Sequence, residues 1–151
     1  MYAKVLLCYD GTAEGRRALR HGADVVICMK SEAYLLAIVQ SLVATAIPEG
    51  VTPLLAQSED GRAQTLLDEG VQWLRERGVS AQGSLEYGGA VDCIAATAQR
   101  IGADLIVVGH RPRSRLARWW SASDEESLLE RVRCSILVAA SPPGEGGNEG
   151  R

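Results

Sequence analysis

The apolar residues of this chain gather in five short runs, and the segments between the runs show helical periodicity. Runs rich in Val, Ile, Leu and Tyr predict β-strands, and a continuous run predicts a strand buried on both faces of a parallel sheet. The third run alternates apolar with polar residues, which is typical of a strand at a sheet edge. The predicted strands are Val5–Tyr9, Ala33–Val39, Val79–Tyr87, Leu105–Val108, ended by Gly109, and Ser135–Ala139.

The intervening segments carry apolar residues three and four positions apart, as amphipathic helices do. Gly78 and Gly102 are natural C-terminal stops for two of them. Ser123 with Glu126 three residues later predicts a capping box at the start of the last helix. Residues 41–61 contain Pro and Gly and no clean period, so we expect a long connection with a helical turn near Leu54. The predicted helices are Ala13–Met29, Arg62–Arg77, Val91–Ile101 and Asp124–Val132.

This alternation of strand and helix predicts an α/β fold, a doubly wound five-stranded parallel sheet with helices on both faces. Residues 1–140 form one domain, and residues 141–151 are predicted to be a disordered tail. Ligands of such folds bind at the carboxyl ends of the strands, where the winding reverses. In the strand order 3-2-1-4-5 the reversal lies between the first and fourth strands. Asp10 follows the first of these and Gly109 the fourth.

Composition narrows the class of protein without defining its function. The chain has 46% hydrophobic and 23% charged residues and a net charge of −3, which is typical of a globular protein and gives no reason to expect nucleic-acid binding. Four widely spaced cysteines in apolar segments are interpreted as buried thiols in a reducing cytosol. No signal peptide or membrane-spanning run is apparent, so a cytoplasmic location is expected.

The candidate chemistry lies after the fourth predicted strand. A strand leading through a glycine and a basic loop to a capped helix is a common way to hold an anion. The loop arginines are more often a solvated face than an anion site, and Ser123 is first a helix cap and second a phosphate ligand. His110 could act as a base, but no nucleophile stands at a recognised spacing, and neither histidine has a metal-ligand pattern. The basic residues of the loop are Arg111, Arg113, Arg115 and Arg118.

Asp10 is the other polar residue next to the expected crevice. Its carboxylate could contact a ribose or a metal ion, or it could form an Asx turn between strand and helix. The residues alone do not decide between these interpretations.

The chain resembles the universal stress protein family along nearly its whole length. The likeness rests on KVLLCYDGT at the start, LLAIV in the second strand, and ADLIVVGH followed by a Ser-capped helix and the closing SILVA. The resemblance implies the strand order 3-2-1-4-5. It also implies a homodimer in which the last strands pair across the interface.

Many members of that family bind ATP through a motif of Gly, two residues, Gly, nine residues and Gly-Ser/Thr. Laid on this chain, the motif falls on Gly109, Pro112, Ala122 and Ser123, so two of three glycines are missing. Pro112 has no N–H to donate, and Ala122 adds a methyl group where close approach is needed. The carboxylates of Asp124 and Glu125 would repel a phosphate there. The chain thus resembles the subgroup that does not bind ATP.

The resulting interpretation is a cytoplasmic, non-enzymatic stress-response protein that acts by binding, as a homodimer through its last strand, and does not hold ATP tightly. Further protein partners are possible, and no membrane, nucleic acid or metal site is expected. The alternative is an adenine-nucleotide switch or slow ATPase that binds ATP with Mg through loop arginines. The resemblance carries adenine and ribose contacts onto Asp10 and Ile38. The candidate nucleotide-binding residues are Asp10, Ile38, Gly109, His110, Arg111, Arg113 and Ser123.

Overall fold

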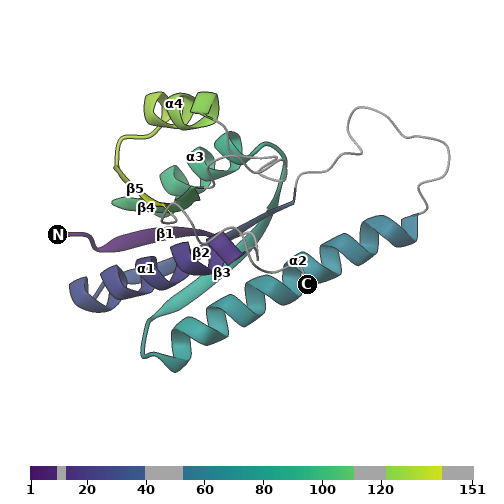
Figure 1. Ribbon diagram of the computed structural model, residues 1–151, viewed down its shortest axis with the longest axis horizontal. Helices are drawn as coiled ribbons and strands as arrows, with labels where there is room; N and C mark the ends of the chain where they lie inside the picture. Colours follow the sequence, from purple (N-terminus) through teal and green to yellow (C-terminus); the bar gives the residue numbers. More distant parts are fainter. Residues whose placement is uncertain (10–12, 40–52, 111–121, 141–151) are drawn as a thin grey trace, which may run out of the picture.

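The computed structural model describes residues 1–9, 13–39, 53–110 and 122–140, with side chains for 1–9, 16–39, 61–109 and 127–139. Five strands and four helices alternate along these segments (Figure 1). The strands are β1 (Lys4–Tyr9), β2 (Glu32–Val39), β3 (Ala81–Tyr87), β4 (Leu105–His110) and β5 (Ser135–Ala140). The helices are α1 (Ala13–Met29), α2 (Pro53–Glu76), α3 (Ala90–Ile101) and α4 (Ala122–Arg131).

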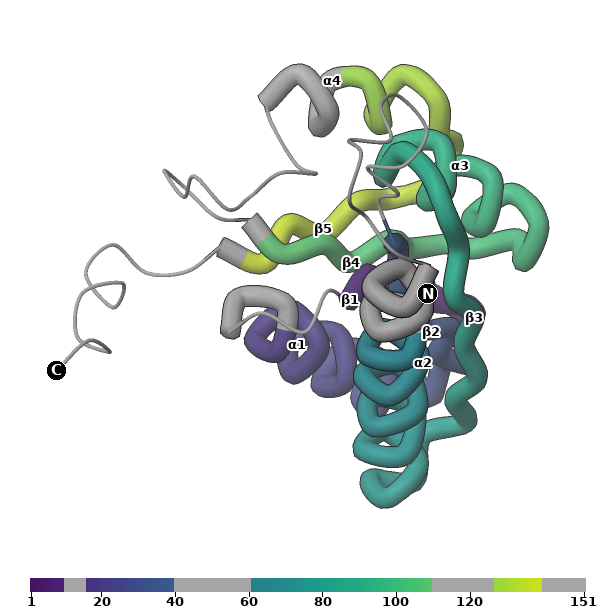
Figure 2. The backbone as a smooth tube through the Cα atoms, turned by 90° about the vertical axis from the view of Figure 1, so that its right-hand side faces the viewer, coloured from purple at the N-terminus to yellow at the C-terminus, as the bar shows by residue number. Residues whose placement is uncertain are grey.

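All five strands are parallel and lie in the order β3-β2-β1-β4-β5, which confirms the predicted fold. Helices α1 and α2 cover one face of the sheet, and α3 and α4 cover the other (Figure 2). β1 is the central strand, and its side chains alternate between the two layers. Val5 and Leu7 pack with the residues of α1 and α2, whereas Leu6 and Cys8 pack with those of α3 and α4. β3 is an edge strand, as its alternating sequence predicted.

Helix α2 is longer than the sequence pattern predicted. It begins at Pro53, whereas the pattern placed residues 41–61 in a connection and began the helix at Arg62. Pro53 explains the difference in part, because proline at the first helical position has the right φ and lacks an N–H that would have no helical partner there. The rest of the predicted connection, residues 40–52, lies outside the described residues.

Three details around the last strands also differ from expectation. Gly109 does not end β4: it pairs with Ala139, and His110 pairs with Ala140. Helix α4 begins at Ala122, so Ser123 lies inside its first turn and does not precede it as a cap. The predicted tail, residues 141–151, lies outside the described part of the chain.

The cysteines are not uniformly buried. Cys8 is buried in the core, but Cys28 on α1 is exposed, and Cys93 and Cys134 are half-buried. The expectation of four buried thiols is therefore wrong for three of them. All four are free cysteines. No helix in the described segments is long and apolar enough to cross a membrane.

Candidate functional site

The two central strands separate at their carboxyl ends. β1 pairs with β4 from Val5–Leu105 to Leu7–Val107. β1 remains paired with β2 as far as Tyr9, and β4 with β5 as far as His110. Within the described segments, the register of β1 with β2 thus extends two residues further than its register with β4. Because the chain winding reverses between β1 and β4, this separation lies where doubly wound folds place a ligand crevice.

The structure describes some of the predicted site residues with their side chains, others by their backbone only, and others not at all. Ile38 lies near the end of β2, is half-buried and packs against the core on the α3 side. Tyr9, which precedes Asp10, pairs with Ala37, which precedes Ile38. The two positions expected to contact adenosine, Asp10 and Ile38, therefore each come directly after one member of this pair in the sequence.

Three of the other predicted residues lie in β4 and in helix α4, which follows it in the chain. Gly109 is half-buried in β4, and His110 and Ser123 are placed by their backbones, at the end of β4 and in the first turn of α4. Asp10, Arg111 and Arg113 lie outside the described residues, so their predicted contacts stay predictions. The structure thus brings Ile38 and Gly109 to one edge of the sheet, with β1 between their strands.

The first residues of α4 determine which groups an anion would contact at the carboxyl edge of the sheet. A helix N-terminus offers unpaired backbone N–H groups and the positive end of the helix dipole. Because α4 begins at Ala122, the residues Ser123, Asp124 and Glu125 occupy its first turn. The helix therefore places two acidic residues next to the backbone groups that would otherwise favour a phosphate.

A second polar region at the same edge links β2, β3 and α3. The Gly88 N–H donates to the Val39 carbonyl at 3.1 Å, which ties the ends of β2 and β3 together. Gly88 has a φ of 129°, which residues with side chains rarely adopt. One turn into α3, the Cys93 thiol lies 3.5 Å from the Tyr87 carbonyl and donates to it. Burial, followed by the negative charges of Glu86 and Asp92, raises the pKa of Cys93, so this thiol resists ionisation.

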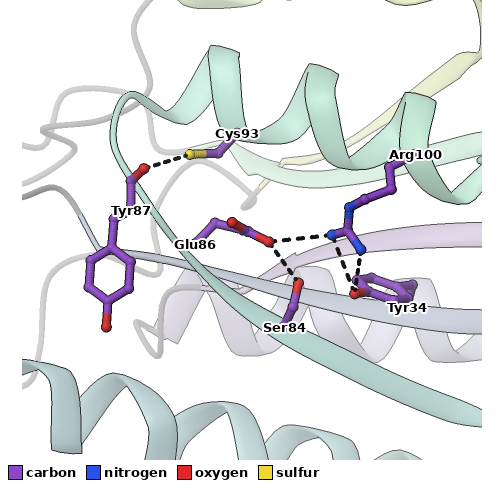
Figure 3. Close-up of polar contacts among 6 residues, drawn as sticks. All are labelled: Tyr34, Ser84, Glu86, Tyr87, Cys93 and Arg100. Atoms are coloured by element: carbon purple, nitrogen blue, oxygen red, sulfur yellow. Dashed lines mark hydrogen bonds and ion pairs between the residues drawn. The ribbon is translucent and has the colours of Figure 1, made fainter.

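Further along the same face, Arg100 contacts Tyr34 and Glu86 (Figure 3). Its guanidinium donates to the Tyr34 hydroxyl at 3.4 Å and forms an ion pair with Glu86 at 3.3 Å. The Ser84 hydroxyl donates to the same Glu86 carboxylate at 3.4 Å. These contacts raise the pKa of Arg100, chiefly through the hydrogen bond to Tyr34. The group is a charged, partly exposed cluster on the part of the sheet next to α3.

Sequence reasoning missed this cluster, which we call the Arg100 cluster: Tyr34, Ser84, Glu86 and Arg100. A period of two would have placed Ser84 and Glu86 on one face of β3. Their meeting with Arg100 depends on the strand register and on where α3 crosses the sheet, which a single sequence does not reveal. No group of three or more His, Cys, Asp or Glu side chains able to hold a metal ion occurs among the side chains that the structure describes.

The fold and the separated strands define a doubly wound α/β protein whose switch point lies between β1 and β4. Residues 1–140 match the universal stress protein family, and the chain belongs to that family. This confirms the family resemblance seen in the sequence. The universal stress protein MJ0531 of Methanocaldococcus jannaschii is 25% identical over 146 residues, which cover 96% of this chain and 86% of that protein.

Solved structures of the family share the fold. A universal stress protein in complex with cAMP superposes with a TM-score of 0.68 at 18% identity, covering 91% of this chain and 97% of that one. The universal stress protein from Archaeoglobus fulgidus in complex with dAMP superposes with a TM-score of 0.64 at 15% identity, again covering 91% and 97%. At these identities the likeness is one of fold.

Proposed function

We propose that this protein is a non-catalytic regulatory binding protein of the stress response that works as a homodimer in the cytoplasm and does not hold ATP tightly. The observation that carries the proposal is the position of Asp124 and Glu125 in the first turn of α4. Two like charges about 4 Å apart repel by about 4 kcal/mol at an effective dielectric near 20. A triphosphate at this helix would meet that repulsion, with Pro112 and Ala122 replacing two of the motif glycines.

The test begins with protein purified without added nucleotide. The protein is denatured, any released small molecule is identified, and Mg-ATP is titrated into fresh protein by calorimetry. We expect no bound nucleotide and no binding heat at micromolar concentrations. Low-micromolar affinity for Mg-ATP in the wild-type protein would overturn the proposal.

Two double variants test whether the acidic residues and the missing glycines are the cause of weak ATP binding. The double variant Asp124→Asn with Glu125→Gln removes the repulsion, and Pro112→Gly with Ala122→Gly restores the motif glycines. Each is expected to raise the affinity for Mg-ATP. The matched control, Glu69→Gln with Glu76→Gln, removes two exposed carboxylates from α2 and is expected to leave the affinity unchanged.

A second candidate function, an adenine-nucleotide switch, is favoured by the separation of β1 and β4. The cAMP and dAMP complexes of related structures support this candidate, since both ligands carry adenine and a single phosphate. One phosphate needs fewer backbone donors than three, and Arg111 and Arg113 could supply the remaining charge. The test is a titration with AMP: Arg111→Ala with Arg113→Ala should abolish binding, and unchanged affinity would contradict the role of these arginines.

The homodimer is supported by the exposed apolar side chains of β5. This strand lies at the sheet edge, and its Leu137 and Val138 are 36% and 40% exposed. Leu129 on the neighbouring α4 is 64% exposed. An apolar edge strand left unpaired is an aggregation hazard, so pairing with a second copy would protect it.

Sedimentation equilibrium tests the dimer directly. The wild type should have the mass of a dimer, and Val138→Lys should have that of a folded monomer, because it places a charge in the apolar edge. The matched variant Gln82→Lys adds the same charge to the opposite edge strand and should remain dimeric. A monomeric wild type would remove the homodimer from the proposal.

A further inference from the structure

A cavity of about 300 Å³ lies between α3 and the connection from α4 to β5. Small apolar side chains of α3 and the residues after it form one wall, namely Ala95, Ala98 and Ala103. Arg131, Arg133 and Cys134 line the opposite side. Its volume is at the small end of the range typical of small-molecule sites, so a compact ligand would fill it.

Two arginines line this cavity, and in the described part of the chain only one of them is already paired with a carboxylate. Arg131 is already bound to the carboxylate of Asp92. Among the residues that the structure describes, Arg133 forms no ion pair or hydrogen bond through its side chain, and it is exposed. The nearby carboxylate of Asp104 accepts main-chain N–H groups of Ala3 and Lys4. Its negative charge also acts on Cys134 in the cavity wall, so Arg133 must outweigh it for an anion to bind.

The C-terminal end of α3 at this cavity is closed by hydrogen bonds of its own backbone. The Gly102 N–H donates to the Gln99 carbonyl at 3.3 Å, and the Ala103 N–H donates to the Ala98 carbonyl at 2.9 Å. Gly102 has a φ of 68°, the left-handed conformation that closes helices in this way. Two of the carbonyls that would repel an anion therefore already accept hydrogen bonds.

We propose that this cavity binds a small organic anion, whose single carboxylate or phosphate group pairs with Arg133 and whose apolar body packs on Ala95, Ala98 and Ala103. An arginine guanidinium is suited to planar, bidentate pairing with either group. Lining residues Ala103 and Cys134 come just before β4 and β5, so the cavity lies at the amino edge of the sheet. In Figure 1 this edge is on the same side of the molecule as the N-terminus. The separation of β1 from β4 is at the opposite edge, so this site does not depend on the function proposed there.

Benzoate and phenyl phosphate are the probes, with benzamide as the neutral analogue of benzoate and inorganic phosphate as the anion without an apolar body. Each is titrated into the full-length protein and followed by amide chemical shifts in NMR. Benzoate or phenyl phosphate is expected to shift Ala98, Ala103 and Cys134 with millimolar affinity. Benzamide and inorganic phosphate are expected to bind at least tenfold more weakly. The stronger of the two aryl anions identifies which head group the cavity prefers.

Three variants test separately the ionic contact with Arg133 and the packing on the apolar wall. Arg133→Gln should weaken binding at least tenfold, and Ala95→Leu should abolish it by filling the cavity. Arg62→Gln removes an exposed arginine on α2 and should change the affinity less than twofold. A second readout uses the cavity cysteine: saturating probe should slow alkylation of Cys134 but not of exposed Cys28. Equal binding of benzamide, or unchanged affinity in Arg133→Gln, would overturn the proposal.

Discussion

Asp104 and Lys4 bind each other reciprocally across 100 positions of sequence. The Lys4 N–H donates to the Asp104 carboxylate at 2.9 Å, and the Asp104 N–H donates to the Lys4 carbonyl at 2.9 Å. The same carboxylate oxygen accepts the Ala3 N–H at 2.8 Å. These bonds join the start of β1 to the residue before β4. The two central strands are thus held together at the amino edge of the sheet, whereas their pairing ends at Leu7–Val107, before the carboxyl edge.

Replacing this carboxylate should change how stability depends on pH. The N–H groups of Lys4 and Ala3 hold the pKa of Asp104 below its ordinary value. A carboxylate with a lowered folded-state pKa stabilises the fold above its unfolded pKa, and that contribution is lost as pH falls through the folded pKa. Asp104→Asn should therefore lower the free energy of unfolding above about pH 5, and its difference from wild type should shrink towards about pH 3.

Urea unfolding followed by circular dichroism at several pH values measures this difference. The control variant Asp24→Asn removes a carboxylate from the exposed surface of α1. If Asp104→Asn is no more destabilising than this control at pH 7, or if its effect is constant with pH, the anchoring role is contradicted.

A glycine in β3 tests how closely the sheet packs against α2. A Cβ atom at Gly83 would lie 2.7 Å from the Leu35 carbonyl oxygen and 2.8 Å from the Leu67 side chain. Gly83→Ala should thus destabilise the fold by about 1–3 kcal/mol, because the backbone of the paired strand β2 cannot move away cheaply. The measurement is urea unfolding at pH 7.

Gly61→Ala is the matched control for that substitution. Gly61 lies in α2 with nothing within 4 Å of its added Cβ. Alanine is the better helix former, so this variant should be as stable as the wild type or more stable by up to about 1 kcal/mol. Similar losses in both variants would show that close packing at Gly83 is not the cause.

Most of the fold was predictable because its strongest determinants are local. Continuous apolar runs identified four strands and an alternating run identified β3. Glycine after a helix located the end of α3, where Gly102 adopts the left-handed conformation. The start of α2 was less predictable. Residues after Pro53 show no clean helical period, and the proline that suggested a break is instead the first residue of the helix.

For the candidate site, the sequence predicted the position in the fold but not the contacts between residues. Topology places Ile38 and Gly109 at one edge, and the strand order follows from the family resemblance. The pairing of β1 with β4 stops at Leu7–Val107, which no sequence pattern indicates, because both strands remain apolar beyond that point. Contacts such as that between Arg100 and Tyr34 join positions 66 apart and depend on the packing of α3 over the sheet.

The Arg100 cluster should contribute little to stability. The side chains of Arg100 and Glu86 are 53% and 40% exposed, so water and salt screen their attraction. A double-mutant cycle with Arg100→Gln and Glu86→Gln should give a coupling energy below about 1 kcal/mol. The coupling should fall further in 1 M NaCl. A coupling that is larger and insensitive to salt would mean that the pair is shielded in solution by a partner or a second copy.

The charge of Glu86 should also control the reactivity of Cys93. Burial is the main cause that raises the pKa of this thiol, and the carboxylates of Glu86 and Asp92 raise it further. The thiolate is the form that reacts with iodoacetamide. Removing one negative charge stabilises the thiolate, so Glu86→Gln should move the midpoint of the alkylation rate of Cys93 to lower pH.

Cys134 provides the control within the same protein for this prediction. Its pKa is raised by burial and by the charge of Asp104, and Glu86 is not among the causes. Peptide mass spectrometry follows both thiols in one reaction, so unfolding or a general change in reagent access would affect both. We expect Glu86→Gln to shift the midpoint of Cys93 and to leave that of Cys134 in place. A parallel shift at both thiols would mean that the variant loosens the α3 layer, since of the two thiols only Cys93 is affected by the charge of Glu86.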